Sequence, residues 1–303
     1  MSVNANPFSA PGRFFKGNLH AHTTQSDGRL SPEDLVALYR DRGGYDFLAI
    51  TDHDRFTDRP SLSSDGFLVV RGAEYHPGAN ALGFDHHIVC IGLTSEVPGA
   101  RELGAQELID AVAARGGVTI LAHPYWHGCT FADLIGLEGA IGVEVFNTVC
   151  DLHIGKGPSG IVWDDLLARG KRLFGFAVDD CHASGPDFFG GWVMLKAQEL
   201  STDSVVAALK AGCFYSSCGP EIRDLVVTDD GLRIECSPVR EVRILSRGPS
   251  GAAFYAPRDD RLELVEHDMT NLKGYFRAQV TDDEGRSAWT NPFYLDDEGK
   301  LIR

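Results

Sequence analysis

The alternation of short apolar runs with helical segments constrains the fold of this chain more than any other feature. The runs are rich in β-branched and aromatic residues, and they recur from Phe14 to about Ser217. Such alternation is typical of a parallel sheet covered by helices. The expected strands are Phe47–Thr51, Leu68–Ala73, His87–Leu93, Val118–Ala122, Ile141–Phe146 and Leu173–Val178.

The segments between these runs carry recognisable helix ends. Ser31 can cap a helix, Pro32 suits its first turn, Asp34 completes a capping box and Gly43 closes the helix. Three further helices, each followed by glycine, are expected at Ala105–Arg115, Trp163–Arg169 and Thr202–Ala211. These signals support an α/β domain.

Several of the expected strands end in residues of the types that commonly bind metals. His53 follows the first run, Glu74 the second, His123 the fourth, and Asp180 and His182 the last. In α/β folds, functional sites collect at the carboxyl ends of the strands. A hydrogen-bonded structural residue would be the simpler explanation at any one of these positions, but not for all of them together.

Two more histidines precede the first helix. His20 and His22 are two residues apart, so on an extended backbone both side chains point to the same face. Asp27 follows in a turn-forming stretch, where it is either an oxygen ligand or a loop residue.

Together these residues form a set that is costly to bury without cations. The eight candidates are five imidazoles and three carboxylates: His20, His22, Asp27, His53, Glu74, His123, Asp180 and His182. Bound metal would relieve their repulsion and desolvation. Imidazole combined with carboxylate favours zinc, manganese or iron over calcium, and Glu74 can bridge two ions.

After Gly219 the pattern changes to short strands separated by turns. The expected strands are Ile222–Val227, Leu232–Cys236, Glu241–Leu245, Leu262–Glu266 and Tyr275–Thr281, with the clearest hairpin turn at Asp230-Gly231. We therefore expect two domains, 1–218 and 219–303, the second a small antiparallel β-sandwich. Only one of the 11 histidines, His267, lies in it, which assigns the chemistry to the first domain.

Composition excludes several classes of protein. A net charge of −15 argues against an extended nucleic-acid-binding surface. No apolar stretch approaches the roughly 18 residues of a membrane span. The seven cysteines include no CxxC pair, and with no signal-like N-terminus they suggest reduced thiols in a cytoplasmic protein. Assembly into a homo-oligomer is left open.

The motifs NLHAHTTQSDG, AITDHD, GAE, LAHP and DDCH occur in an order that resembles the PHP (polymerase and histidinol phosphatase) superfamily, over the first ~217 positions. The resemblance implies a distorted (β/α)7 barrel with two or three divalent ions. It implies one ion on His20, His22, Glu74 and Asp180, a second on Glu74, His87 and His123, and a third on Asp27, His53 and His182. His87 is preferred to His86 because it begins an apolar run, as the family's ligand does. Asp27 stands where some members have histidine.

The end of the chain, including GCFYSSCGP and AWTNP, resembles the carbaryl-hydrolase-like branch of this superfamily. The leading hypothesis is a phosphoesterase acting on a small, anionic ester, in which ions bridged by Glu74 activate water and His53 or His182 assists the leaving group. The alternatives are a carboxyl or carbamate ester hydrolase with the same site, and a metal-stabilised binding protein without catalysis. His76, His127 and His153 are interpreted as loop histidines, although His76, two residues after Glu74, could support the site.

Overall fold

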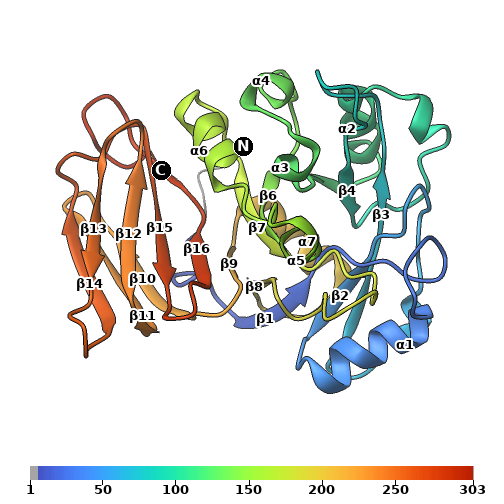
Figure 1. Ribbon diagram of the computed structural model, residues 1–303, viewed down its shortest axis with the longest axis horizontal. Helices are drawn as coiled ribbons and strands as arrows, with labels where there is room; N and C mark the ends of the chain where they lie inside the picture. The colour runs from blue at the N-terminus through green and yellow to red at the C-terminus, as the bar shows by residue number, and fades with distance from the viewer. Residues whose placement is uncertain (1–5, 303) are drawn as a thin grey trace.

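The computed structural model describes residues 6–302, which form a mixed α/β structure extended by antiparallel strands (Figure 1). The strands of the α/β part are β1 (Arg13–Asn18), β2 (Phe47–Ile50), β3 (Leu68–Tyr75), β4 (Ile88–Ile91), β5 (Val118–Leu121), β6 (Gly142–Asn147) and β7 (Phe174–Val178). They lie side by side in chain order. All neighbouring pairs are parallel except the two that β4 makes with β3 and β5.

Strands β2, β4, β5 and β7 are buried along their whole length. On one face, side chains such as Phe47, Ile120 and Phe176 form a common apolar core. On the other face, side chains such as Cys90, Leu121 and Val143 pack in a second core with the helices. Burial of both faces explains why these strands appear in the sequence as continuous apolar runs.

The helices are α1 (Pro32–Ala37), α2 (Ala105–Ala113), α3 (Pro124–His127), α4 (Phe131–Leu134), α5 (Thr148–Ile154), α6 (Gly160–Ala168) and α7 (Thr202–Ala211). A π-helical turn occurs at Leu38–Arg42, and 3₁₀ turns occur at Pro60–Leu62 and Ala100–Glu102. The predicted cap of α1 is confirmed, because the Ser31 hydroxyl accepts the Asp34 N–H at 3.1 Å. Helix α6 begins earlier than predicted, and α3, α4 and α5 were not predicted.

The extensions of β1 and β7 meet at one end of the sheet. Ala21 forms a parallel bridge with Cys181, and the His22 N–H donates to the Cys181 carbonyl at 2.8 Å. Over Arg13–Gly17, the same edge of β1 is instead paired with β8 (Trp192–Ala197). The predicted α/β organisation is confirmed, but the strict β/α repeat is not, because β3 and β4 are antiparallel and no helix separates them.

The remaining strands are β9 (Phe214–Ser217), β10 (Ile222–Val227), β11 (Gly231–Val239), β12 (Glu241–Ser246), β13 (Gly251–Tyr255), β14 (Leu262–Asp268), β15 (Tyr275–Thr281), β16 (Ser287–Thr290) and β17 (Phe293–Tyr294). The predicted hairpin before Gly231 is present, since Val227 pairs with Leu232. Strands β10, β11 and β14 form a separate sheet, whose apolar residues share a core with those of β12 and β15.

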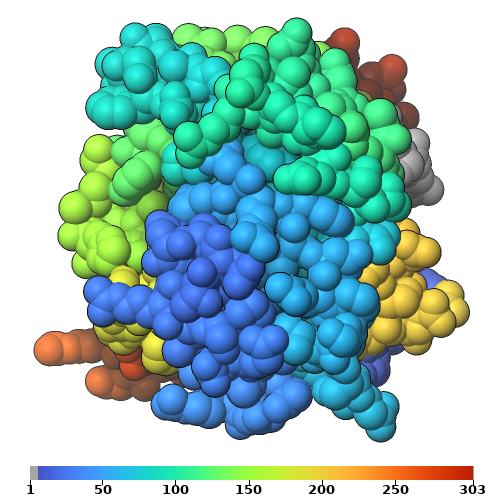
Figure 2. All heavy atoms as spheres, turned by 90° about the vertical axis from the view of Figure 1, so that its right-hand side faces the viewer, coloured from blue at the N-terminus to red at the C-terminus, as the bar shows by residue number. Residues whose placement is uncertain are grey.

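The antiparallel strands are joined to the α/β part. Strand β16 pairs with β9, so one sheet runs from β13 through β9 and β8 to β7. Arg277 of β15 donates to the Asp164 carboxylate of α6 at 2.8 and 2.6 Å. The domain boundary at 218 therefore remains a prediction. The end of the molecule away from these strands consists mainly of the first half of the chain (Figure 2). Among the described helices, none is long and apolar enough to cross a bilayer.

Candidate metal centre

The nine predicted ligands lie at one rim of the sheet. His20, His22, His53, His123, Asp180 and His182 follow the carboxyl ends of parallel strands, and Glu74 lies near the end of β3. His87 instead immediately precedes β4. Because β4 runs antiparallel to its neighbours, its amino end lies at the same rim as their carboxyl ends. The reversal of β4 thus brings His87 to the site.

Glu74 is the centre of the cluster and is fully buried. Its Oε1 faces His87 Nδ1 at 2.9 Å and His123 Nε2 at 3.3 Å. Its Oε2 faces His53 Nδ1 at 2.8 Å and the Nε2 atoms of His20 at 3.2 Å and His22 at 3.4 Å. The two oxygens therefore face different sets of imidazoles, as a bridging carboxylate requires.

Asp180 completes the buried group formed with His20, His22 and Glu74. Its Oδ1 lies 2.9 Å from His22 Nε2 and 3.2 Å from His20 Nε2. These four residues offer donor atoms that all lie within 4.8 Å of one another. This is the set that the family resemblance implies for the first ion.

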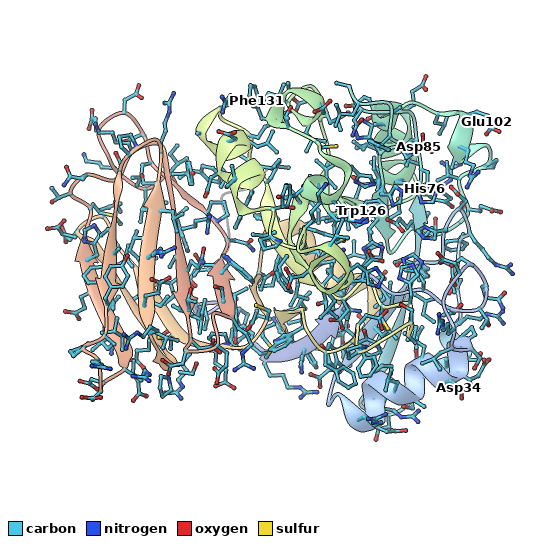
Figure 3. The ribbon with its side chains drawn as sticks, viewed as in Figure 1. Asp34, His76, Asp85, Glu102, Trp126 and Phe131 are labelled. Carbon is cyan, nitrogen blue, oxygen red and sulfur yellow. The ribbon has the colours of Figure 1, made fainter. Side chains whose placement is uncertain are left out.

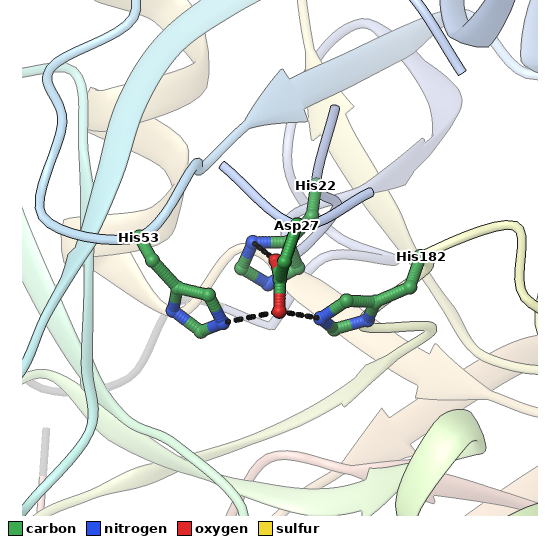
Figure 4. A group of neighbouring side chains, drawn as sticks. All are labelled: His22, Asp27, His53 and His182. Carbon is green, nitrogen blue, oxygen red and sulfur yellow. Dashed lines mark ion pairs between the residues drawn. The ribbon is translucent and has the colours of Figure 1, made fainter. Parts of the chain in front are cut away.

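A second group is more exposed and includes Asp27 (Figure 4). The Asp27 Oδ2 atom lies 3.6 Å from His53 Nε2 and 3.4 Å from His182 Nε2. Its Oδ1 lies 3.9 Å from His22 Nδ1. The structure therefore brings Asp27 to the position implied for a ligand of the third ion, with His22 as an additional neighbour.

His86 and His87 lie differently relative to the cluster. His87 faces Glu74, whereas His86 belongs to none of the groups of potential metal donors among the described residues. Alternation along the extended chain explains the difference, because adjacent side chains point to opposite faces.

Glu144 is a site residue that sequence reasoning missed. It lies in β6 and is fully buried. Its Oε1 lies 2.7 Å from His20 Nδ1, and its Oε2 accepts the His123 N–H at 2.9 Å and Asn147 Nδ2 at 2.8 Å. A carboxylate that orients the other nitrogen of a metal-binding histidine is a recurrent feature of metal sites. A lone glutamate within the apolar run Ile141–Phe146 was the available signal.

Two histidines that were interpreted as loop residues lie beside the cluster. His76 groups with His53, Glu74 and His87, and His127 groups with His87 and His123. His153 is exposed but lines the adjoining cavity. His76 is thus placed where it could support the site, as the sequence left open, and His127 lies in the short helix α3.

The backbone around the cluster is strained. Of six described non-glycine residues with positive φ, Asp54, His123 and Asp180 lie in or beside it, at φ values of 48°, 24° and 56°. Each of their backbone N–H groups donates to a residue of the site. The Asp54 N–H donates to the Glu74 carbonyl at 2.7 Å, the His123 N–H to the Glu144 carboxylate, and the Asp180 N–H to the His20 carbonyl at 2.9 Å. Such conformations cost about 1–3 kcal/mol each, and they persist where the surroundings enforce them.

The donor set fits divalent cations. Several buried polar atoms of the cluster make no hydrogen bond of suitable geometry in the described structure, although some lie close to an oppositely charged group: His20 Nε2, His22 Nδ1, His53 Nδ1, Glu74 Oε2, His76 Nε2, His123 Nδ1 and His127 Nε2. Buried polar atoms are rarely left unpaired in proteins, and imidazole with carboxylate suits zinc, manganese or iron. Divalent ions would satisfy these atoms.

Without metal, imidazolium charges stand in for cations beside the carboxylates: burial lowers the pKa of His20, but the charges of Asp180 and Glu74 outweigh it and raise that pKa well above the ordinary value. Burial opposes ionisation of Glu74, but the charges of His20 and His87 outweigh it and hold its pKa well below the ordinary value. Burial lowers the pKa of His22 to about 4. The Glu74 carboxylate is thus ionised and His22 neutral at pH 7, which are the forms that bind metals.

A cavity of about 360 Å³ opens beside the cluster. Its lining residues are Asp27, Arg29, His53, His87, His123, Trp126, Val149, Cys150, His153, Asp180, His182 and Ser184. Trp126, labelled in Figure 3, lies 5.3 Å from His123 between ring centroids. The cavity therefore combines metal-type donors with a cationic side chain, Arg29, and an aromatic wall.

With this geometry established, comparison with known proteins gives the fold. No protein-family model matches the chain. An uncharacterised protein of Methanocaldococcus jannaschii is 28% identical over 144 residues, which cover 44% of this chain and 81% of that protein.

A crystal structure from Bacteroides vulgatus, of a two-domain protein containing a predicted PHP-like metal-dependent phosphoesterase, matches with a TM-score of 0.51. The two chains are 17% identical, and the match covers 93% of this chain and 95% of the other. The lesion-specific endonuclease EndoQ of Pyrococcus furiosus matches more weakly, with a TM-score of 0.46, 12% identity and coverage of 65% and 56%. The match to the Bacteroides structure gives this chain a PHP-like fold, and the resemblance seen in its motifs is confirmed at the level of the fold.

Proposed function

We propose that this protein is a metal-dependent phosphoesterase that hydrolyses a small, anionic phosphomonoester or phosphodiester. The observation that carries the proposal is the position of Glu74, which is fully buried with each carboxylate oxygen facing a different set of imidazoles. Such a carboxylate suits the bridge of a multinuclear hydrolytic centre. The similar two-domain structure from Bacteroides vulgatus contains a predicted metal-dependent phosphoesterase, which supports phosphoester hydrolysis as the reaction.

The residues divide into sites for two or three divalent ions of zinc, manganese or iron. His20, His22, Glu74 and Asp180 would hold one ion, and Glu74, His87 and His123 a second. Asp27, His53 and His182 would hold the third. When bound, such ions acidify water and neutralise charge on the ester oxygens. The distorted (β/α)7 barrel and the carbaryl-hydrolase-like branch remain part of this proposal.

Residues of the chain supply the rest of the chemistry. The His182 Nδ1–H donates to the Asp180 carbonyl at 2.8 Å, which fixes the ring with Nε2 on the side of Asp27. In that orientation Nε2 can bind an ion or hold a proton for the leaving oxygen. Arg29, which lines the same cavity, provides positive charge for an anionic substrate.

A substrate panel tests the proposal. Purified protein loaded with zinc, manganese or iron is assayed with nitrophenyl phosphate, bis(nitrophenyl) phosphate, nitrophenyl acetate and an aryl carbamate. We expect turnover of at least one phosphate ester and its loss in Glu74→Gln. Glu263→Gln, an exposed change on β14, serves as control.

Hydrolysis of only the carboxyl or carbamate esters would replace this function by the competing esterase. Metal binding without turnover of any substrate would favour a binding protein. Full activity of a folded, metal-loaded Glu74→Gln variant would refute the proposed bridge.

A further inference from the structure

His76 lies at the edge of the cluster but has no place in the three proposed sites. It follows β3 directly, two residues after Glu74, and its side chain is only 10% exposed. Its ring centroid lies 4.1 Å from that of His87 and 4.7 Å from that of His53. Figure 3 labels this residue. His76 is therefore within reach of residues assigned to the metals.

The ring of His76 is held in one orientation by a charged pair. Its Nδ1–H donates to Asp54 Oδ2 at 2.8 Å. The same oxygen accepts Nε of Arg101 at 2.7 Å, and Nη2 of Arg101 lies 2.6 Å away. The Asp54 backbone is itself anchored to the Glu74 carbonyl. A histidine that binds metal through one nitrogen commonly donates its other N–H to a carboxylate in this way.

The other nitrogen, Nε2, is buried and has no hydrogen-bond partner in the described structure. His53, Glu74, His76 and His87 offer donor atoms that all lie within 4.8 Å of one another. His127 also has an unpartnered Nε2, but within residues 6–302 no hydrogen bond orients its ring. His76 is thus the histidine outside the nine predicted ligands that is positioned for coordination.

We propose that His76 is a further metal ligand, which through Nε2 joins Glu74, His87 and His123 at the second ion, with His53 as a neighbour. Three imidazoles and one carboxylate suit zinc, iron or manganese. Asp54 and Arg101 act as positioning residues that keep Nε2 directed at the ion. The inference rests on the proposed metal-dependent function, because it adds a ligand to the same centre.

Metal binding by the full-length protein tests this role independently of activity. Wild type, His76→Asn, Arg101→Gln and His267→Asn are stripped of metal and titrated with Zn²⁺ against a chromophoric chelator. Parallel titrations with Co²⁺ record the visible absorption of the bound ion. His267, on β14, is the control because it is a histidine outside the cluster. Arg101 provides a milder variant, since its side chain is 69% exposed.

We expect His76→Asn to bind one ion at least tenfold more weakly and to change the Co²⁺ spectrum. Arg101→Gln should weaken the same ion by a smaller factor, and His267→Asn should match wild type. If His76→Asn does not fold, the Zn²⁺ affinity of Arg101→Gln tests the inference, and wild-type affinity in that variant would overturn it. Wild-type affinity, stoichiometry and Co²⁺ spectrum in folded His76→Asn would overturn the inference while leaving the phosphoesterase proposal intact. Absence of metal binding by wild type would overturn both.

Discussion

Glu144→Gln tests the structure most directly, because the substitution preserves the shape of the side chain, removes its charge and replaces one acceptor oxygen by an NH₂ donor. Glu144 Oε2 accepts two N–H donors, from the His123 backbone and the Asn147 amide, and Oε1 faces His20 Nδ1. A glutamine amide has one acceptor oxygen and one donor nitrogen. In the variant, the amide nitrogen must therefore face either the N–H donors of His123 and Asn147 or the Nδ1–H donor of His20.

Both orientations of the amide are unfavourable. If the glutamine NH₂ faces His123 and Asn147, two buried donors lose their acceptor, at about 1–3 kcal/mol each. If it faces His20, Nδ1 must accept, so the proton moves to Nε2, the atom that faces Glu74 and Asp180. The variant should adopt the second orientation, which loses only the charge-assisted contact to His20, so we expect its free energy of unfolding without metal to fall by about 1–3 kcal/mol.

Loss of the carboxylate behind His20 should also weaken metal binding by about 10–100-fold, or roughly 1.4–2.7 kcal/mol. Urea denaturation in EDTA measures the stability, and chelator competition measures the affinity. Glu138→Gln is the matched control, since Glu138 is 79% exposed and pairs with Lys171 at the surface. Metal affinity within twofold of wild type and unchanged stability would refute the assigned role of Glu144.

Three further predictions concern the cavity, the contact between β15 and α6, and the protonation of His182. Arg29→Gln should raise KM for an anionic ester about tenfold with little change in kcat, because Arg29 lines the cavity without belonging to the predicted ligands; an unchanged KM in steady-state kinetics would count against it. Asp164→Ala should lower the free energy of unfolding by about 3 kcal/mol, because the side chain of Arg277 is 2% exposed and would lose its carboxylate partner. Chemical denaturation measures this loss, and a change below about 1 kcal/mol would argue against a stabilising role of the ion pair. Burial lowers the pKa of His182, but the hydrogen bond to Asp27 and the charge of Asp180 outweigh it and raise the pKa to about 9 in the metal-free protein. The proton must leave when His182 binds metal, so affinity should rise up to tenfold per pH unit between pH 6 and 8; a flat profile in chelator competition would contradict this.

The sequence alone was sufficient for the residues whose position depends on local backbone geometry. His20 and His22 share a face because they are two residues apart, and His53 and His123 follow short apolar runs, rich in β-branched residues, that are typical of buried strands. Once those strands are parallel neighbours, their carboxyl ends meet at one rim. The same local rules predicted the capped start of α1 and the hairpin before Gly231.

Only the tertiary structure decided the features that depend on partners distant in the chain. Glu144 meets His20 across 124 residues, and Asp54 is paired with Arg101 across 47. The pairing of β9 with β16, which makes one sheet of the two predicted domains, and the reversal of β4, which delivers His87, are also non-local. A local pattern records which face of a strand is buried, but it carries no information on which charged group, or which strand, lies against that face.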